Sequence, residues 1–357
     1  MKNLILITLL ILTFITGDTY TQSYFGKSFF RDRIQANNVL YVTALAQGTN
    51  EHATIASALS AYQTGMLIIL APEYFDEDVT ISIDNVHIQG VSKELSKIKS
   101  LIVTGGFVNI NNLTVVNDAV FKSAKTVNYF DTKIVLNDID FFGNLSLGTS
   151  THRLDESFLI KDCTMYGDNK LIVNTLYGLH SDRIILNMRM LPIATEGVIG
   201  NRSDIWIYEG NLRFESSGTM YVDSLKFITT DKYAFVGFYH CYPLFIDVIY
   251  TTTSTQYHIL VIQHCVLTLG TTSDFIFNGI FELDVIQSSV SIKTNIIFNS
   301  TANSRFDGFQ QRGYNSPTTI TGTGLAYLRI YHSTFRCTAP AGVADDRNNV
   351  WSAFIDD

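Results

Sequence analysis

A short pattern of apolar and polar positions recurs along most of the chain. It runs apolar, any residue, polar, small or apolar, any residue, apolar, as in Ile110–Val115. The polar third position, called the marker below, falls at Asn85, Asn112, Asp138, Asp162, Asn187, Asn211, His240, His264, Ser288 and His332. Successive markers are 24 to 29 residues apart, except for a last step of 44.

A step in the low-to-middle twenties predicts one coil of a parallel β-helix. Each coil would hold two or three short strands, and successive coils would stack about 4.8 Å apart. Because Asn and Asp tolerate unusual backbone angles, we expect the markers at a bend of each coil. The prediction is an all-β, right-handed parallel β-helix of roughly ten coils of about 24 residues each.

Two other folds share part of this pattern. A leucine-rich horseshoe has a similar period but needs a leucine-dominated repeat and helical or 3₁₀ segments. Ile, Val, Phe and Thr dominate here, and helical spacing is nearly absent after residue 62. An antiparallel sandwich would show hairpin turns instead of a sustained period. The β-helix therefore fits the pattern best.

The start of the repeat region predicts a helical cap. Residues 54–62 read as a short amphipathic helix with Thr54 as its N-cap, and Gly65 ends it. Such a helix would cover the open apolar end of the coil stack. We expect an irregular lead-in over residues 18–50 and a single β-helix domain over residues 51–357.

Residues 1–17 have the layout of an export signal. A short positive start precedes an apolar run from Leu4 to Ile15, and Thr16-Gly17 offers a small residue before Asp18. The segment is a cleaved signal peptide or a retained membrane anchor. Either interpretation predicts an extracellular, cell-surface or virion location.

If the chain is exported, its glycosylation sequons and its cysteine pair become relevant. An exported chain can be glycosylated at Asn-x-Ser/Thr sequons, which occur at Asn112, Asn144, Asn201 and Asn299. Cys241 and Cys265 each follow a marker, and the two markers are 24 residues apart. We therefore expect these cysteines on adjacent coils, close enough for a disulfide where their rotamers permit one.

Charge and residue types narrow the range of partners. The net charge is −8 and Lys and Arg are not clustered, which argues against a nucleic-acid partner. We expect His240, His264 and His332 to stack as a structural ladder, with no metal ion and no cofactor. The acidic run Asp76-Glu77-Asp78 fits a solvated turn as well as a calcium site.

Four segments share a pattern with one family of β-helix enzymes. They are Thr54 to Tyr74 with Glu77-Asp78-Val79; Phe238-Tyr239-His240-Cys241 with Asp247-Val248-Ile249-Tyr250; Gly270 to Phe277; and Gln311-Arg312-Gly313 with Pro317 and Thr321-Gly322. In these segments the chain distantly resembles the pectin methylesterases of the pectate-lyase-like β-helix superfamily. The Asp274–Phe277 segment is the most specific of the four.

The resemblance implies a nucleophile at Asp274 and a proton donor and acceptor at Asp247. The chain departs from the family pattern around both residues. Ile246 replaces a glutamine, Ser273 is inserted before Asp274, and the family's Leu-Gly-Arg-Pro-Trp segment is not found. Since Ile cannot donate a hydrogen bond, a stabiliser of the oxyanion would be missing. Asp274 is better explained as a turn residue before the strand Phe275–Phe277, and Asp247 as a bend or outward-facing residue.

Two functions of different classes remain open at this point. The first is an exported, non-catalytic β-helix protein with a structural, attachment or glycan-contacting role, such as a virion-surface or extracellular assembly component. Its expected partners are a glycan or cell-surface polysaccharide, other copies of itself, or other structural proteins. The second is a carbohydrate-active enzyme, a pectin methylesterase-like esterase or a polysaccharide lyase.

Overall fold

The computed structural model describes most of the chain between residues 38 and 351. The described residues are 38–122, 133–149, 154, 157–175, 184–193, 202–228, 234–245, 249–251, 258–269, 275–278, 281–286, 289–292, 296–299, 304–309, 312–313, 320–321, 328–331, 334–335, 344–347 and 350–351.

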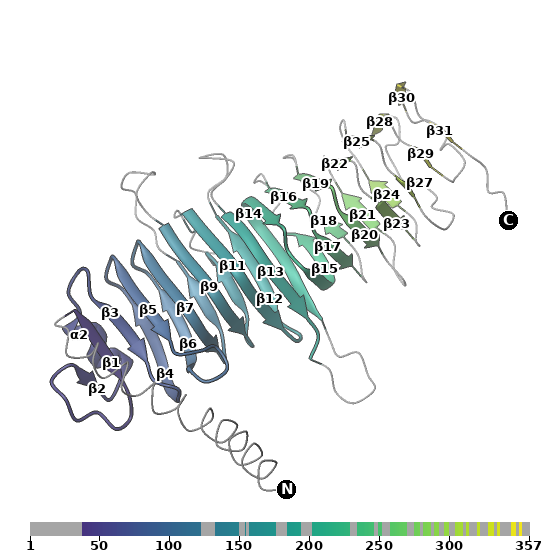
Figure 1. Ribbon diagram of the computed structural model, residues 1–357. Coiled ribbons are helices and arrows are strands. Elements are labelled where there is room, and N and C mark those ends of the chain that lie inside the picture. Colours follow the sequence, from purple (N-terminus) through teal and green to yellow (C-terminus); the bar gives the residue numbers. More distant parts are fainter. Residues whose placement is uncertain are drawn as a thin grey trace, which may run out of the picture.

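The strands stack in parallel, coil upon coil, into an elongated β-solenoid (Figure 1). Coils average about 24 residues but vary in length: Ile68 lies opposite Ile88, Ala234 opposite His258, and Val108 opposite Ile134, which are steps of 20, 24 and 26 residues. Three faces result, and each is a ladder of parallel strands. Face 1 consists of β1 (Val39–Val42), β3 (Leu67–Leu70), β5 (Val86–Gly90), β7 (Val108–Val115), β9 (Lys133–Phe141), β11 (Ser157–Tyr166), β13 (Ile184–Leu191), β14 (Ser203–Glu215), β16 (Ala234–Tyr239), β19 (His258–Gln263), β22 (Phe281–Ile286), β25 (Ser304–Phe309), β28 (Leu328–Tyr331) and β30 (Ala344–Arg347).

Long strands bend from one face onto the next. Face 2 contains the ends of β7, β9, β11 and β13 together with β4 (Tyr74–Ile81), β6 (Lys97–Val103), β15 (Thr219–Phe227), β17 (Tyr242–Phe245), β20 (Val266–Leu269), β23 (Ser289–Ile292) and β26 (Arg312–Gly313). Face 3 contains the second halves of β4 and β6, β8 (Ala119–Phe121), β10 (Leu145–Leu147), β12 (Lys170–Asn174), the first half of β14, the end of β15, β18 (Ile249–Thr251), β21 (Phe275–Asn278), β24 (Ile296–Asn299) and β27 (Ile320–Thr321). Two short strands, β2 (Glu51–His52) and β29 (Thr334–Phe335), pair with β1 and with β31 (Val350–Trp351).

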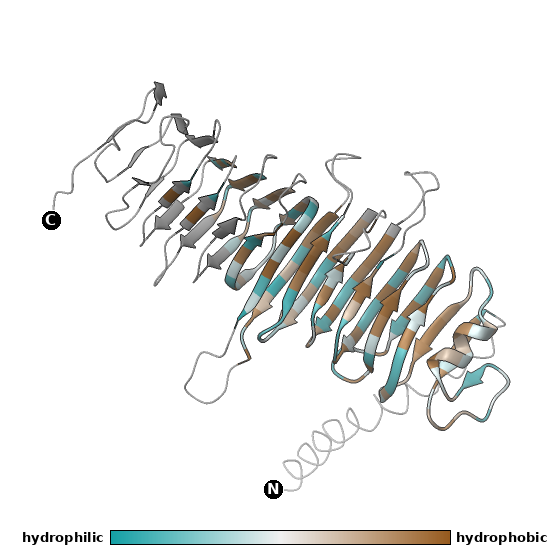
Figure 2. Ribbon diagram, turned by 180° about the vertical axis from the view of Figure 1, so that it is seen from behind, coloured by the Kyte–Doolittle hydropathy of each residue, from teal (hydrophilic) through white to brown (hydrophobic). Residues whose placement is uncertain are grey.

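Alternate side chains of each strand fill the interior of the solenoid, so apolar and polar residues alternate along the ribbon (Figure 2). Aromatic rings meet from coil to coil inside. The rings of Phe214 and Phe238 stack with centroids 4.8 Å apart and planes 3° apart. Phe121 and Phe158 meet edge to face at 4.9 Å. The core therefore runs continuously through the stack, as the period predicts.

The bend between faces 1 and 2 explains the marker residues. Asn112, Asp138, Asp162, His240 and His264 have φ between 52° and 55°, the left-handed region that Asn, Asp and His enter more readily than other side chains. The prediction that markers lie at a bend is confirmed at these five positions.

Three markers behave differently. Asn85, with φ 57°, lies at the bend before face 1, in the same place as Phe107 on the next coil. Asn211 lies within β14 opposite Phe235, and Ser216 forms the bend of that coil. On β13, Asn187 is the single residue that lies opposite two residues of β11, where β11 forms a bulge, and its φ is not positive. The prediction that Asn211 is equivalent to Asn112 was therefore wrong.

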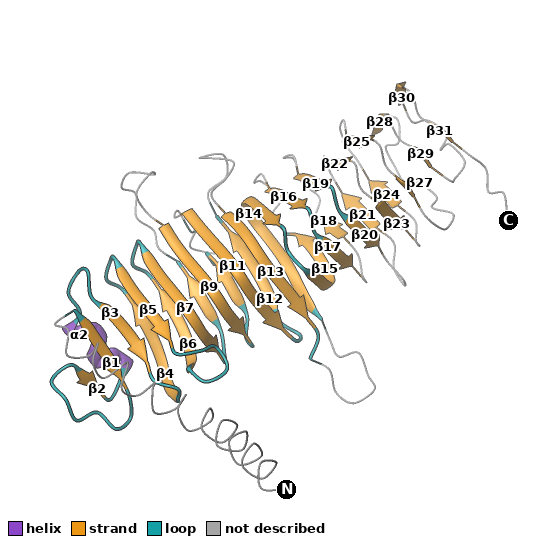
Figure 3. Ribbon diagram, in the orientation of Figure 1, coloured by secondary structure: helices purple, strands orange, loops and turns teal. Residues whose placement is uncertain are grey.

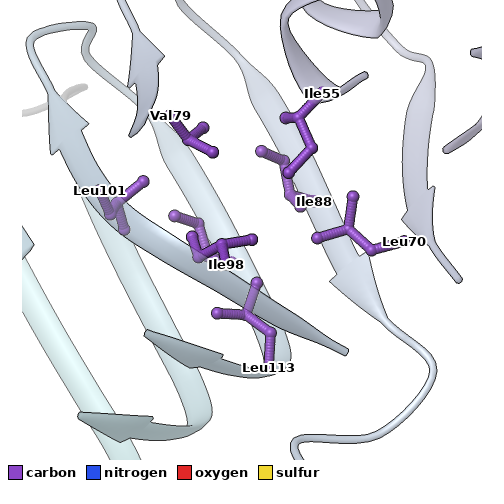
Figure 4. A pocket seen from close by; sticks show the side chains of 8 residues that line it. Ile55, Leu70, Val79, Ile88, Ile98, Leu101 and Leu113 are labelled. Atoms are coloured by element: carbon purple, nitrogen blue, oxygen red, sulfur yellow. The ribbon is translucent and has the colours of Figure 1, made fainter. Parts of the chain in front are cut away.

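A short helix, α2 (Ile55–Ala61), covers the first coils as predicted (Figure 3). Its N-cap is Thr54, whose hydroxyl accepts a hydrogen bond from the Ser57 amide at 3.1 Å. Ile55 is buried and faces a small apolar cavity between the coils, which it lines with Leu70, Val79, Ile88, Ile98, Ile110, Leu101 and Leu113 (Figure 4). With no polar lining atoms, this cavity does not hold a polar ligand.

The ladder also shows where the coil stack begins. β1 lies inside the stretch that the sequence predicts as an irregular lead-in, and it pairs with β3 from Val39 to Val42. Since the ladder runs from β1 to β30, the number of coils differs from the ten expected from the markers.

Candidate functional site

The outer side of face 3 carries two neighbouring columns of side chains, with one residue from each coil. Both columns follow from the strand register, which places residues of the same orientation directly opposite each other. The polar column consists of Asp78, Ser100, Asp118, Asn144, Lys170, Asp204 and Ser224. The second column is mostly apolar and consists of Ile102, Val120, Ser146, Ile172, Trp206 and Lys226.

Hydrogen bonds link the polar column from coil to coil. The Ser100 hydroxyl donates to Asp78 Oδ1 at 2.6 Å. The Asn144 side chain donates to Asp118 Oδ1 at 3.0 Å and accepts from the Lys170 amide at 2.9 Å. These contacts satisfy side chains that lie against the sheet, and they fix the register of neighbouring coils.

The columns end in a patch of aromatic and charged residues on β12, β14 and β15. This patch, called the Trp206 patch below, consists of Lys170, Arg202, Asp204, Trp206, Tyr221 and Lys226. The Lys170 ammonium lies 4.0 Å from the centroid of the Trp206 ring, and the Lys226 ammonium lies 5.5 Å from it. Both distances are within the range of cation–π attraction. The indole is half-buried, so its outer edge faces solvent.

The carboxylate of the patch orients its neighbours. Asp204 accepts a hydrogen bond from Trp206 Nε1 at 3.2 Å and another from the Ser224 hydroxyl, and its Oδ2 lies 3.6 Å from the Lys226 ammonium. The Arg202 guanidinium lies 5.3 Å from the centroid of the Tyr221 ring. These contacts hold one indole, one phenol and three cations in fixed positions on the outer side of the parallel strands.

The two candidate catalytic residues, Asp247 and Asp274, lie outside the described residues. The strands that follow them, β18 and β21, are neighbours on face 3, with Tyr250 opposite Ile276. The described strands β18 and β21 thus belong to adjacent coils. The catalytic assignment itself stays a prediction.

Three of the four sequons lie in the described part of the chain. Asn112 is a bend residue, and Asn144 belongs to the polar column with both ends of its amide engaged. Asn299 donates to Asn278 Oδ1 at 3.0 Å on the adjacent coil. Each asparagine has a structural place in the stack, while Asn201 lies outside the described residues. Glycosylation stays a prediction at all four.

Cys241 and Cys265 lie on adjacent coils, as their spacing predicts. The Cys241 amide donates to Cys265 Sγ at 3.4 Å, and both side chains are buried free thiols. The hydrogen bond that the Cys265 thiol donates to the Cys241 side chain, together with burial, raises the pKa of the Cys265 thiol. Burial likewise raises the pKa of Cys163 to about 12. Proximity is therefore confirmed, and the disulfide stays a prediction.

The histidines and the acidic run are both accounted for by packing. The rings of His240 and His264 stack with centroids 4.8 Å apart and planes 9° apart, while His332 lies outside the described residues. Glu77 accepts from the Ile55 amide at 2.9 Å, at the start of α2. Asp78 pairs with Lys99 at 3.1 Å. Within the described ranges, no three metal-binding side chains gather at one place.

The sequence analysis missed the Trp206 patch. The alternation Asp204-Ile205-Trp206-Ile207 shows that the aspartate and the tryptophan point to the same side of a strand. Lys170 lies opposite Asp204, which comes 34 residues later in the sequence. This step is longer than the average coil length of about 24 residues. A search at the usual period could therefore not bring these residues together.

The chain gives no match to known proteins in three comparisons. No protein-family model matches it, and neither curated proteins nor solved structures give a match. The parallel β-solenoid agrees with the fold of the pectate-lyase-like superfamily, whereas the likeness to pectin methylesterases stays a resemblance. In the parts of the chain that the structure describes, no helix is long and apolar enough to span a membrane.

Proposed function

We propose that the protein is an exported, non-catalytic rod that contacts a glycan through the Trp206 patch. The observation that supports this function is the patch itself, in which Trp206 and Tyr221 lie among charged side chains on the outer side of the solenoid. A sugar ring presents apolar C–H groups and many hydroxyls. Aromatic rings beside fixed polar groups suit both properties.

The solenoid suits this role mechanically. In the described part of the chain, ladders of parallel strands join neighbouring coils on up to three faces, so a contact at one point is transmitted through a stiff body. An elongated rod with export features is typical of extracellular or virion-surface attachment and assembly. Self-association and assembly with other structural proteins belong to the same proposal.

Replacing Trp206 by alanine is expected to abolish glycan retention. Aromatic anchors commonly contribute 2 kcal/mol or more to binding, so we expect affinity to fall at least about tenfold. The test is a glycan-array screen of the purified protein followed by titration of the best binder. Tyr74→Ala serves as the matched control, because Tyr74 is 53% exposed and lies away from the patch. Equal retention by Trp206→Ala and the wild type would refute the proposal.

The enzymatic alternative gives a separate prediction. With Ile246 in place of a hydrogen-bond donor, we expect no release of methanol from methylated polygalacturonate, since losing one such donor typically lowers the rate by about 10²–10³. Methanol is measured with the wild type and with Asp274→Asn. Release by the wild type that disappears in the variant would establish the esterase instead.

A further inference from the structure

The Trp206 patch retains hydrogen-bond donors that no protein group uses. The Lys170 ammonium contacts the Trp206 ring and forms no ion pair with any residue that the structure describes. Nη1 of Arg202 is buried and makes no hydrogen bond to any residue in the described part of the chain. A guanidinium and an ammonium are donors only, so each needs an acceptor or water.

The hydrogen-bond acceptors of the patch, in contrast, already have partners. Asp204 accepts hydrogen bonds from Trp206 Nε1 and from the Ser224 hydroxyl, and it forms an ion pair with Lys226. Asp168 and Asp223, the neighbouring acidic residues, have interaction partners as well. The unused hydrogen-bonding capacity is therefore cationic, although the whole chain carries a net charge of −8. Such an excess of donors matches a ligand that supplies negative oxygen atoms.

We infer that Lys170 and Arg202 bind anionic substituents, carboxylates or sulfate monoesters, along the glycan of the proposed function, on which this inference rests. Lys170 lies opposite Asp204 of β14, and Arg202 immediately precedes β14, two residues before Asp204. Their Cα atoms are thus diagonal neighbours, about 8 Å apart. The contacts with Trp206 and Tyr221 place the two cations on opposite sides of Asp204, so a polymer with repeated anionic groups can contact both.

The aromatic rings prepare both cations for this role. Trp206 holds the Lys170 ammonium at 4.0 Å, and Tyr221 lies 5.3 Å from the Arg202 guanidinium. Cation–π contacts restrict these flexible side chains without neutralising their charge. An anion can then bind with less loss of side-chain entropy than at free surface lysines.

The test compares three polymers on the full-length protein. Binding of heparin, hyaluronan and dextran, which are sulfated, carboxylated and neutral, is measured at low and at physiological salt. We expect the wild type to bind at least one anionic polymer about tenfold more tightly than dextran, and Lys170→Gln and Arg202→Gln each to lose about tenfold. Lys161→Gln is the charge-matched control, because Lys161 is exposed on face 1. It should change affinity less than about twofold.

Each outcome bears on one of the two proposals. Heparin binding alone assigns a sulfate, hyaluronan binding assigns a carboxylate, and both support the inference. Equal binding of dextran, or an equal loss in Lys161→Gln, overturns the inference. The proposed function survives that result if Trp206→Ala still removes the binding. Failure of glycan arrays and all three polymers to bind overturns the proposed function together with the inference.

Discussion

Gly90→Ala is expected to destabilise the protein by about 3 kcal/mol or more and to reduce the yield of folded protein. Gly90 ends β5 at the bend between faces 1 and 2, opposite Asn112 of the next coil. A Cβ atom at this position would overlap the Asn112 carbonyl oxygen and lie 3.0 Å from its carbonyl carbon. The overlap is with backbone, which cannot rotate away as a side chain can.

The surroundings of Gly90 also prevent relief by a shift of the chain. Ser96 is fully buried there, and its hydroxyl donates toward the carbonyls of Leu70 and Ala71 at 3.1 and 3.0 Å. The Val91 amide in turn donates to this hydroxyl at 2.9 Å. Moving the bend outward would break these buried hydrogen bonds, and each broken bond costs about 1–3 kcal/mol.

Gly48→Ala is the matched control for this substitution. A Cβ atom at Gly48 would approach only the flexible side chain of Glu51, at 3.3 Å. We expect its urea midpoint to stay close to that of the wild type, while Gly90→Ala unfolds at lower urea or accumulates as insoluble protein. Equal midpoints for Gly90→Ala and the wild type would show that the coils are less tightly stacked than in the structure.

The bend residues show how far sequence alone reaches. Asn112, Asp138 and Asp162 could be assigned to equivalent positions because a left-handed backbone selects Asn and Asp. Ser216 occupies the same bend without such a preference, so the polar Asn211 five residues earlier was assigned in its place. A repeat specifies the coil, whereas the register of an individual coil depends on the packing of its neighbours.

The candidate site depends still more on three-dimensional placement. Lys170, Asp204 and Ser224 follow each other in one column, with sequence steps of 34 and 20 residues. Loop length outside the strands changes these steps without changing the stack, because a surface loop tolerates insertion at little cost. A single sequence therefore predicts a polar outer face but not which cations lie beside Trp206.

Lys93→Met is expected to destabilise the protein by about 2 kcal/mol at pH 7. The Lys93 ammonium lies 2.8 Å from Asp138 Oδ1 and 3.5 Å from Asp140 Oδ1, and its side chain is 18% exposed. Lys93 lies in the segment between β5 and β6, whereas Asp138 and Asp140 lie on β9. The ion pairs therefore connect two coils that are separated by the coil of β7. Methionine keeps the apolar contacts of the side chain but leaves the buried Asp140 carboxylate without its counter-ion. The expected loss of stability is smaller than for a fully buried ion pair, because the Asp138 side chain is 40% exposed and water can solvate its carboxylate.

The loss of stability should depend on pH in a defined direction. Burial raises the pKa of Asp140, and Lys93 opposes that rise. Removing Lys93 therefore raises the pKa of Asp140 further above its unfolded value. A carboxyl group whose folded pKa is raised binds its proton more tightly in the folded state, so stability increases as pH falls through that pKa.

We expect the difference in urea midpoint between Lys93→Met and the wild type to shrink between pH 7 and pH 5. Lys99→Met, whose partner carboxylates on Asp76 and Asp78 are 75% and 62% exposed, should change little at either pH. A Lys93→Met deficit that stays constant over this range would show that Asp140 is not the group that Lys93 stabilises.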